Sequence, residues 1–374
     1  MNKCPSCDRV IKSHNCVVCG IQVKVPTSET FPPITWQEIR DHIVERLMIE
    51  PQWMIEEEDE FTWWPYQIPQ SVFVSSRVEL DLDDISETLV RVTIQSILGT
   101  AVDRPKALEA VADPMVDYPF GSIVVLEDDR VVALSSVALY GRNRTLLSLV
   151  HEEALVQATF AQDISAKLVN EGVVIVDHVP HPTSGLRAEP DELLRTIYGN
   201  PKFTSLHEVE DETIRNLARG YWKRSQLQPG RELGFENDDV TFITYEDGFD
   251  CGVGWHDDDF TTYKFGESIT VMNTLRIVSA PIGDEVMNSL NLALAFETQR
   301  GVGHIGAVTQ QTHDEATFIR HIAVLPHYFL KTINEMDGRV LTVFNGILQA
   351  SASARFIHGL LNYEAEDSEE NPDS

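Results

Sequence analysis

Two stretches of this chain follow one pattern, and this repeat limits the folds that the chain can adopt. Residues 121–139 hold two apolar, β-branched runs joined by the polar segment 127–130. Two such runs around a short turn predict a β-hairpin. Residues 303–324 repeat the pattern, at an offset of about 182 residues from Gly121 to Gly303. The repeat predicts one folding unit used twice, and chance similarity between two α+β segments is the alternative.

The first unit, residues 30–170, is predicted to contain a helix, three strands, a helix, two strands and a helix. The first helix begins at a capping box formed by Thr35 and Glu38. Apolar residues then recur at helical spacing. They are Trp36, Ile39, Ile43 and Leu47. The later elements are strands over 61–64, 70–82 and 89–98, a short helix over 103–112, the hairpin, and a closing helix over 146–168. Prolines after the first strand place it at a sheet edge.

The second unit, residues 207–363, repeats this order. A helix over 213–225 leads to strands over 240–245, 249–255, 261–265 and 269–278. A short helix over 284–298, the second hairpin and a closing helix over 341–361 follow. Gly338 is expected to break the chain before that last helix or to lie in a loop. A proline-rich linker, residues 171–206, joins the units, and residues 364–374 read as an acidic, disordered tail.

Four cysteines near the N-terminus form the most specific motif in the chain. Cys4 and Cys7 make one CxxC pair, and Cys16 and Cys19 make a second. Four thiolates from two tight turns can surround one Zn²⁺ tetrahedrally. Residues 1–25 are too few to bury a core, so the metal would supply the folding energy. Two disulfides are the alternative, and they are disfavoured in a chain with no export signal.

This pattern resembles a short zinc ribbon, and the resemblance covers residues 1–25 only. Zinc ribbons bind nucleic acid or protein, or simply cap a fold. Lys3, Arg9, Lys12 and Lys24 face one acid, Asp8, and the four metal-bound thiolates bring the balance to about +1. So small a positive charge favours a structural or recruiting role over nucleic-acid binding.

Composition limits the possible partners. The chain has 374 residues, 43% of them apolar, which is enough for two domains with real cores. Its formal net charge is −30, and such a surface repels phosphate backbones, so the main body is not expected to bind nucleic acid. A basic or amphipathic protein or peptide is easier to accommodate, and the alternative is that the acidity only keeps the protein soluble. No signal or membrane-spanning run was recognised, and the prediction is a cytoplasmic protein.

Candidate catalytic and metal motifs are weak. His151-Glu152-Glu153 fails the HExxH pattern, because residue 155 is leucine. His178 and His181 are expected to be solvated loop histidines, and His256 with the acids 257–259 a solvated turn. Cys251 is expected to be a buried, inert thiol. The sequence therefore predicts no catalytic residues, although an enzyme built around His256 stays an alternative.

Two further motifs have structural explanations. Residues 301–306 satisfy GxGxxG but precede a strand, which is the wrong context for a dinucleotide. The tryptophans at 63 and 64 must point to opposite sides of a strand. One of them, facing outward on an edge strand, is a candidate contact for a partner, and coverage of both faces by helices is the alternative.

The order of elements in both units resembles that of the type III secretion chaperone-like family, which includes the YbjN-like proteins. The resemblance implies a curved antiparallel sheet that binds extended or amphipathic peptides, carried here by strands 72–80, 92–98, 123–126 and 131–139 and their second-unit partners. It implies no catalytic residues. The ribbon and the tandem arrangement depart from the family, and the tandem arrangement suggests a monomer with an internal pseudo-dimer where relatives dimerise.

The predicted fold is thus α+β, with two repeated units of antiparallel sheet flanked by helices behind a zinc ribbon. The predicted function is a non-enzymatic protein- or peptide-binding module, chaperone-like or adaptor-like, with structural Zn²⁺ held by Cys4, Cys7, Cys16 and Cys19. A nucleic-acid-associated regulator that contacts its target through the ribbon is the alternative.

Overall fold

The structure is a computed structural model of the chain. It describes residues 2–3, 10–11, 31–82, 85–117, 121–176, 179–194, 208–227, 231–245, 249–255, 268–296, 303–313, 316–326, 333 and 335–370. Of residues 1–30 it describes only two short paired strands, β1 (Asn2–Lys3) and β2 (Val10–Ile11). The predicted zinc ribbon, with its four cysteines, therefore lies outside the described residues.

The first half of the chain forms one antiparallel sheet with three main helices. Its strands follow the order β3-β4-β5-β6-β8-β7, and β9 pairs with one end of β6. The elements are α1 (Trp36–Arg46), β3 (Met54–Glu56), β4 (Glu60–Trp63), β5 (Gln70–Leu82), β6 (Ile85–Ala101), α2 (Arg104–Asp117), β7 (Ser122–Val125), β8 (Arg130–Tyr140), α3 (Leu147–Asn170) and β9 (Val174–Ile175). Short 3₁₀ turns lie at Pro51–Trp53 and Arg144–Leu146.

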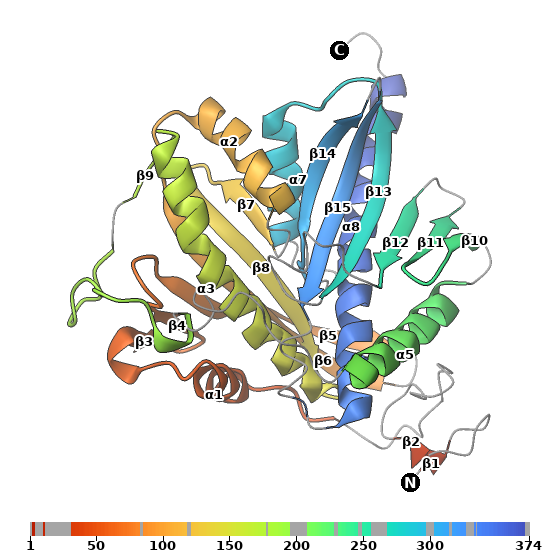
Figure 1. The fold of residues 1–374 in the computed structure, drawn as a ribbon, viewed down its shortest axis with the longest axis horizontal. Coiled ribbons are helices and arrows are strands. Elements are labelled where there is room, and N and C mark those ends of the chain that lie inside the picture. The colour runs from red at the N-terminus through yellow and green to blue at the C-terminus, as the bar shows by residue number, and fades with distance from the viewer. Residues whose placement is uncertain are drawn as a thin grey trace.

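The second half forms a second antiparallel sheet with the order β10-β11-β12-β13-β15-β14. Its elements are α5 (Glu208–Gln226), β10 (Arg231–Glu236), β11 (Val240–Tyr245), β12 (Asp250–Gly254), β13 (Ser268–Val278), α7 (Asp284–Phe296), β14 (Ala307–His313), β15 (Ala316–Pro326) and α8 (Met336–Glu370). Figure 1 shows the two sheets side by side, with α3 lying across the first and α8 along the second.

The two sheets share one topology. In each, four strands are followed by a short helix and a hairpin, and the second hairpin strand inserts beside the last of the four. Gly121 directly precedes β7 and Gly306 directly precedes β14. A Cβ on either glycine would lie within 2.4 Å and 2.3 Å of the carbonyl oxygens of Leu134 and Ile322, respectively. Gly306, and not Gly303, is therefore the counterpart of Gly121, so the predicted offset was three residues too short.

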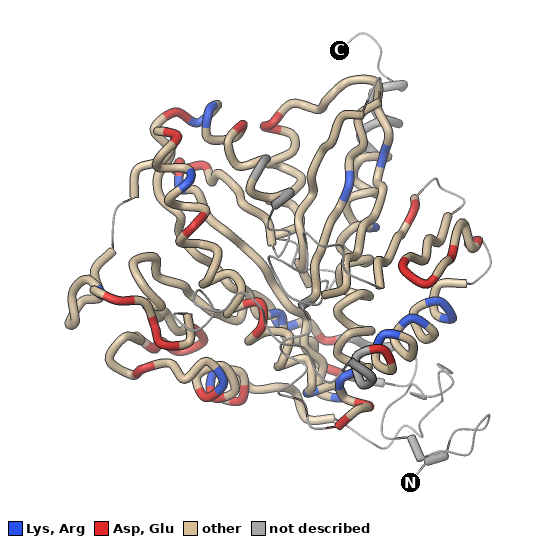
Figure 2. Tube along the Cα trace, viewed as in Figure 1, with Lys and Arg blue, Asp and Glu red and all other residues tan. Residues whose placement is uncertain are grey.

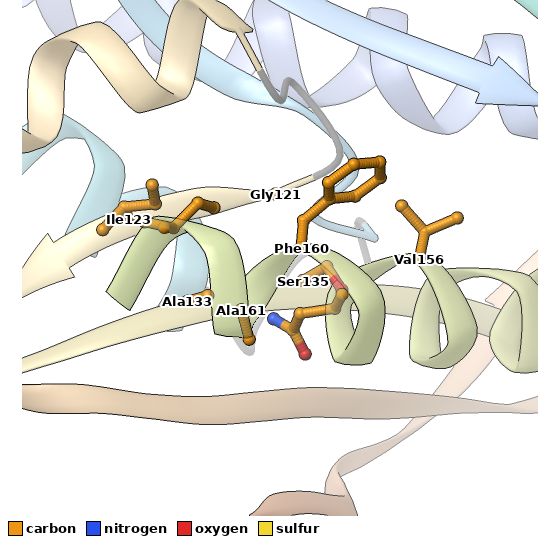
Figure 3. A pocket seen from close by; sticks show the side chains of 9 residues that line it. Gly121, Ile123, Ala133, Ser135, Val156, Phe160 and Ala161 are labelled. Atoms are coloured by element: carbon orange, nitrogen blue, oxygen red, sulfur yellow. The ribbon is translucent and has the colours of Figure 1, made fainter. Parts of the chain in front are cut away.

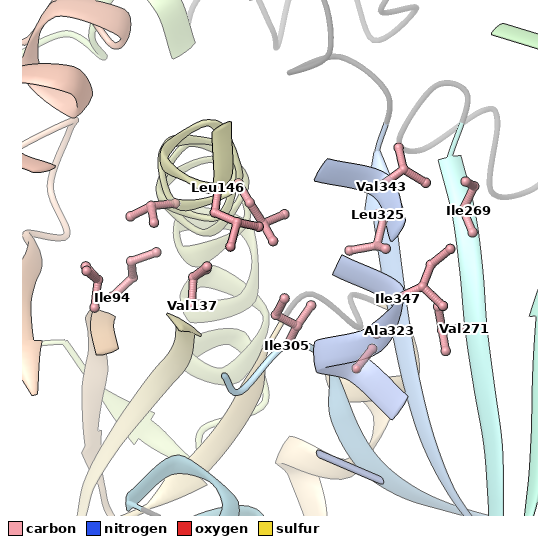
Figure 4. Packing of buried hydrophobic residues seen from close by; sticks show 14 of the residues in the cluster. Ile94, Val137, Leu146, Ile269, Val271, Ile305, Ala323, Leu325, Val343 and Ile347 are labelled. Carbon is pink, nitrogen blue, oxygen red and sulfur yellow. The ribbon is translucent and has the colours of Figure 1, made fainter. Parts of the chain in front are cut away.

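Each sheet packs one face, here called its inner face, on its long helix, and the two cores merge. Contacts between α3 and β6 and between α8 and β13 define the inner faces. One cluster of buried apolar residues extends from Ile94 and Val137 in the first sheet to Ile269 and Val271 in the second. Figure 4 shows residues of α8 such as Ile347 between them. The halves consequently share this largest hydrophobic core cluster.

The opposite, outer faces are partly covered by helices that cross between the halves. Leu292 and Ala295 of α7 pack on the outer face of the first sheet, against Val124, Val132 and Leu134. The short helix of the first half, α2, contacts β14 of the second in the same way. Each half thus covers the hairpin end of the other's outer face.

Buried polar contacts join the halves. Arg91 of β6 is 1% exposed and donates hydrogen bonds to Ser136 and to the carbonyl oxygens of Leu294 and Ala295, at the end of α7. Gln349 of α8 pairs with both backbone groups of Ala138, as a neighbouring strand would. Each half therefore supplies a side chain that hydrogen-bonds backbone groups of the other.

Several local predictions need correction. The chain forms β10, which sequence reading missed, and a short β3 outside β4, so β4 is not the edge strand. Helix α2 continues through Pro114. Gly338 lies inside α8 instead of breaking the chain before it, and a Cβ there would lie 3.2 Å from the Thr145 side chain.

Two predicted segments remain. Helix α8 continues to Glu370, into the stretch where the sequence predicts a tail, and residues 371–374 are outside the described part. The predicted strand 261–265 is outside it as well. The capping box and the apolar stripe of α1 are confirmed, with Trp36, Ile39 and Ile43 buried.

Candidate partner-binding surface

The outer face of the second sheet carries a line of apolar side chains that the described helices leave at least partly exposed, since α2 covers only its hairpin end. Cross-strand pairing aligns one residue from each of five strands, from the edge inward. They are Phe235, Phe242, Gly252, Met272 and Ile322, here called the apolar row. Phe235 is 55% exposed, and Phe242, Met272 and Ile322 are half-buried.

Gly252 flattens the middle of the row. A Cβ at this position would lie 2.5 Å from Cε1 of Phe242. The aromatic ring of Phe242 therefore lies across the backbone of β12, where any larger residue would push it away. The result is a level apolar surface between β10 and β13.

The first sheet lacks this surface. Starting from Leu134, the counterpart of Ile322, strand pairing reaches Gln95, Ser71, Thr62 and Ile55 in turn. The three middle positions are polar, and Thr62 and Ser71 bond to each other at 2.6 Å. The two halves share a fold and differ in what this face can bind.

The second sheet also ends in an open edge. Residues 232–236 of β10 are all exposed. Leu233 and Phe235, one on each face of the strand, are 41% and 55% exposed. The corresponding edge strand of the first sheet, β3, is only three residues long, and Arg40 pairs with its Glu56. Short, charged edges resist pairing with other chains, and a longer apolar edge invites it.

Carboxylates lie on both sides of the edge end of the apolar row. Glu232, Asp238 and Asp239 are exposed in the β10–β11 hairpin and form no ion pair with any described residue, whereas Glu236 pairs with Lys223 of α5. Arg219 of α5 donates to the backbone carbonyl oxygen of Asp238. Asp250 lies beside Gly252, two residues along β12, and its Oδ1 is buried with no hydrogen-bond partner. Figure 2 shows acidic residues at this end of the second sheet and basic residues along α5. The surface suits an apolar ligand that brings positive charge.

The prediction that one of the two adjacent tryptophans faces outward was wrong. Trp63 is 1% exposed and donates to Gln70, and Trp64 is 4% exposed and donates to the carbonyl oxygen of Val179. His181 packs against Trp64 with 4.7 Å between ring centroids, so this loop histidine is buried instead of solvated. His178 lies outside the described residues.

The segment 151–153 is buried in α3. Burial lowers the pKa of His151 to about 3, with His42 adding to the effect, and raises the pKa of Glu153 to about 8. Burial, with the neighbouring Glu153, also raises the pKa of Glu152 well above its usual value. All three side chains lie inside the core, where burial disfavours their charged forms.

Cys251 is buried, as predicted. Its Sγ lies 3.3 Å from Oγ of Ser351, and burial raises the pKa of the thiol to about 12. The nucleophilic species is the thiolate, which is essentially absent here at neutral pH. Cys251 is therefore unsuited to nucleophilic catalysis.

A buried serine–histidine contact joins the two halves, and sequence reading missed it. Ser122 Oγ lies 2.8 Å from His304 Nε2 and 2.5 Å from Oδ1 of Asn291. Asn291 donates through Nδ2 to the carbonyl oxygens of Met287 and Val308, so its Oδ1 must accept the single hydroxyl proton of Ser122. His304 is then the donor to Ser122 and cannot remove a proton from it. The contact fixes the interface and does not activate a nucleophile.

Two cavities lined by described residues are small. One of about 30 Å³ lies between α3 and the hairpin β7–β8, with Gly121, Ser135, Gln157 and Phe160 in its lining (Figure 3). A second of about 30 Å³ lies between α2, α7 and β14. This volume holds about one or two waters and no metabolite.

Metal and membrane predictions can be compared with the described residues only. Cys4, Cys7, Cys16, Cys19 and residues 256–259 lie outside them, and the part of the chain that is described holds no cluster of three metal-ligating side chains. Within that same part, α8 over Met336–Asn362 is long and apolar enough to cross a membrane, and 72% of its most apolar window is buried inside the protein. It serves as the core helix of the second half.

No protein-family model, curated protein or solved structure matches this chain.

Proposed function

We propose that this protein is a non-enzymatic, chaperone-like or adaptor-like module that binds a protein or peptide client through the second sheet. The apolar row carries the proposal. Apolar side chains on an unburied sheet face cost free energy in water, and such patches in native proteins mark interaction sites. Resemblance in element order to the secretion chaperone-like proteins agrees with this proposal.

The buried polar groups support a binding role over a catalytic one. His151, Glu152 and Glu153 are inside the core, Cys251 is protonated, and the Ser122 hydroxyl donates its hydrogen bond to Oδ1 of Asn291. Each therefore acts in packing. The ribbon at residues 1–25, with Zn²⁺ held by the four cysteines, belongs to the proposal as a structural or recruiting cap, and we place the protein in the cytoplasm.

A client screen tests the proposal. The full chain and its Phe235→Asp variant are immobilised and exposed to lysate of the native host, and proteins retained by the wild type alone are identified, purified and titrated. We expect a purified client to bind the wild type at least about tenfold more tightly than the variant, because interface aromatics dominate binding energy. Ile175→Asp is the matched control, since Ile175 is 58% exposed in the first half. The proposal fails if no purified client distinguishes Phe235→Asp from that control.

A further inference from the structure

The apolar row extends well inside the sheet, which limits what can cover it. Phe242 lies one strand in from the open edge, and Met272 lies three strands in. Neighbouring strands are about 4.8 Å apart, so a strand added to β10 would contact Phe235 and leave Met272 uncovered. Only an element that lies on the face can cover the whole row.

The same molecule shows what covers an outer face. In the first sheet, helix α7 lies on Leu134 through Leu292 and Ala295. Leu134 occupies the position that Ile322 holds in the second sheet, at the inner end of the apolar row. A helix is about 10 Å across with its side chains, which is wide enough to cover two or three strands. On the second sheet the equivalent position, at Ile322, lies beside the hairpin end that α2 already covers. The precedent therefore shows that a helix fits an outer face of this fold, and the part of the row left for a further helix runs from Phe235 to Met272.

The charges beside the apolar row indicate which side chains a bound element should carry. Glu232 on β10 and Asp250 on β12 lie on the outer face beside the edge end of the row, and neither forms an ion pair with a described residue. Arg320 of β15 lies at the inner end of the same line and donates to Gln311, so the negative charge is confined to the edge end. Asp238 and Asp239 extend this negative edge. A helix with lysine or arginine beside its apolar stripe complements these groups. A second copy of this chain would bring the same carboxylates face to face, which is unfavourable.

We propose that the apolar row of the second sheet docks one basic amphipathic helix of a partner protein per chain. This inference rests on the proposed client-binding function and adds to it the conformation, the charge and the stoichiometry of the client. The single site follows from Gln95, Ser71 and Thr62, which replace the apolar side chains in the first sheet. The first half then supports the site without duplicating it.

Three synthetic peptides of about 18 residues, or about five helical turns, test the proposal with the full chain. The first has leucine at helical spacing and lysine elsewhere, the second replaces lysine with glutamate, and the third has the composition of the first in strict alternation. Fluorescence anisotropy at about 0.15 M salt gives affinity, and calorimetry gives stoichiometry. We expect the first peptide to bind most tightly, at one per chain.

Two variants of the row locate the binding. Phe242→Asp is expected to weaken the first peptide at least about tenfold. Asp250→Asn, which keeps shape and removes one charge, is expected to weaken it about two- to fivefold. Ile175→Asp is expected to leave it unchanged. Circular dichroism confirms that each variant is folded, and Asp250→Asn keeps the test valid if the others are not.

Several results would overturn the proposal. Tighter binding of the alternating peptide, lost in Phe242→Asp, would leave client binding standing and exclude the helix. Equal binding of the glutamate peptide would exclude the charge assignment, and two peptides per chain would exclude the single site. Concentration-dependent dimerisation that Phe242→Asp abolishes would assign the row to a second copy. If none of the peptides binds, the helix proposal is wrong, whereas the function proposal is decided separately by the client screen.

Discussion

Gly121 and Gly306 occupy equivalent places in two different sheets. Each comes directly before the outer strand of a hairpin, and each has a carbonyl oxygen of the neighbouring strand where a Cβ would be, 2.4 Å away for Gly121 and 2.3 Å for Gly306. The sequence around them is poorly preserved between the halves. The repeat is therefore more exact in its backbone packing than in its side chains.

Because the two glycines have the same surroundings, alanine at either position is predicted to destabilise the protein. We expect Gly121→Ala to lower the free energy of unfolding by about 1–3 kcal/mol, through overlap with the backbone of β8. Gly306→Ala should cost more, because Gly306 also has a φ of 91°. Gly283→Ala is the control, since nothing lies within 4 Å of its Cβ position. Urea denaturation measures all three, and a neutral Gly121→Ala would contradict the close approach.

Arg91 is predicted to hold the two halves together. Arg91→Met removes hydrogen bonds to two buried carbonyl oxygens at the end of α7, and we expect a loss of about 2–4 kcal/mol in the free energy of unfolding. Arg77→Met, on the neighbouring strand β5, removes an ion pair with Asp59 that is nearly half exposed. We expect this control to cost less than about 1 kcal/mol. Similar losses in both variants would argue against the role of Arg91.

Glu153 is predicted to weaken the protein as the pH rises. Its folded pKa, about 8, lies above its unfolded value, near 4.5, so the unfolded chain releases the proton first. Stability is complete below about pH 4.5 and falls as the pH rises towards 8. Glu153→Gln removes this dependence, and we expect it to be more stable than wild type by roughly 2–4 kcal/mol at pH 7, with little difference at pH 4.5.

His151 is predicted to make stability depend on pH in the opposite direction. Its folded pKa, about 3, lies below the ordinary value of 6.5, so its contribution to stability is complete above about pH 6.5 and is lost as the pH falls towards 3. Denaturation curves of His151→Gln and Glu153→Gln should therefore separate from wild type at opposite ends of the pH range. Separation at the same end would refute the assigned burial of one of them.

The metal prediction concerns the N-terminal cysteines. We expect the purified chain to contain one zinc, measured by elemental analysis, and Cys4→Ser combined with Cys7→Ser to contain none. A metal-free chain whose thiols resist alkylation until reduced would instead support two disulfides. A second metal that disappears in His256→Ala would revive the enzyme alternative.

Local sequence signals predicted the element order well. The capping box at Thr35 and the helical spacing of Trp36, Ile39 and Ile43 fix α1 from short-range rules alone. Strand β10 was missed because Arg231, Glu232 and Gly234 interrupt its apolar pattern. An edge strand needs no continuous buried face, so periodicity has little to detect there; the turn residues 237–239 that precede β11 were the available signal.

Contacts between distant segments were beyond sequence reading. Trp64 is buried because residues 179–187 fold over it, which also buries His181 against its ring, and the Arg187 side chain donates to the carbonyl oxygen of Trp64. Likewise the Ser122–His304 contact joins residues of different halves. The apolar row could be recognised only from the strand register, because Phe235 and Met272 are aligned by three successive strand pairings.

The shared core of the two halves has a consequence for how the protein can change. A dimer of identical chains must carry any substitution twice, once in each copy. Here the two copies lie in one chain, so Thr62, Ser71 and Gln95 can be polar while Phe242 and Met272 stay apolar. Covalent linkage has released the symmetry constraint, and selection can act on one sheet for its surface and on the other for its support.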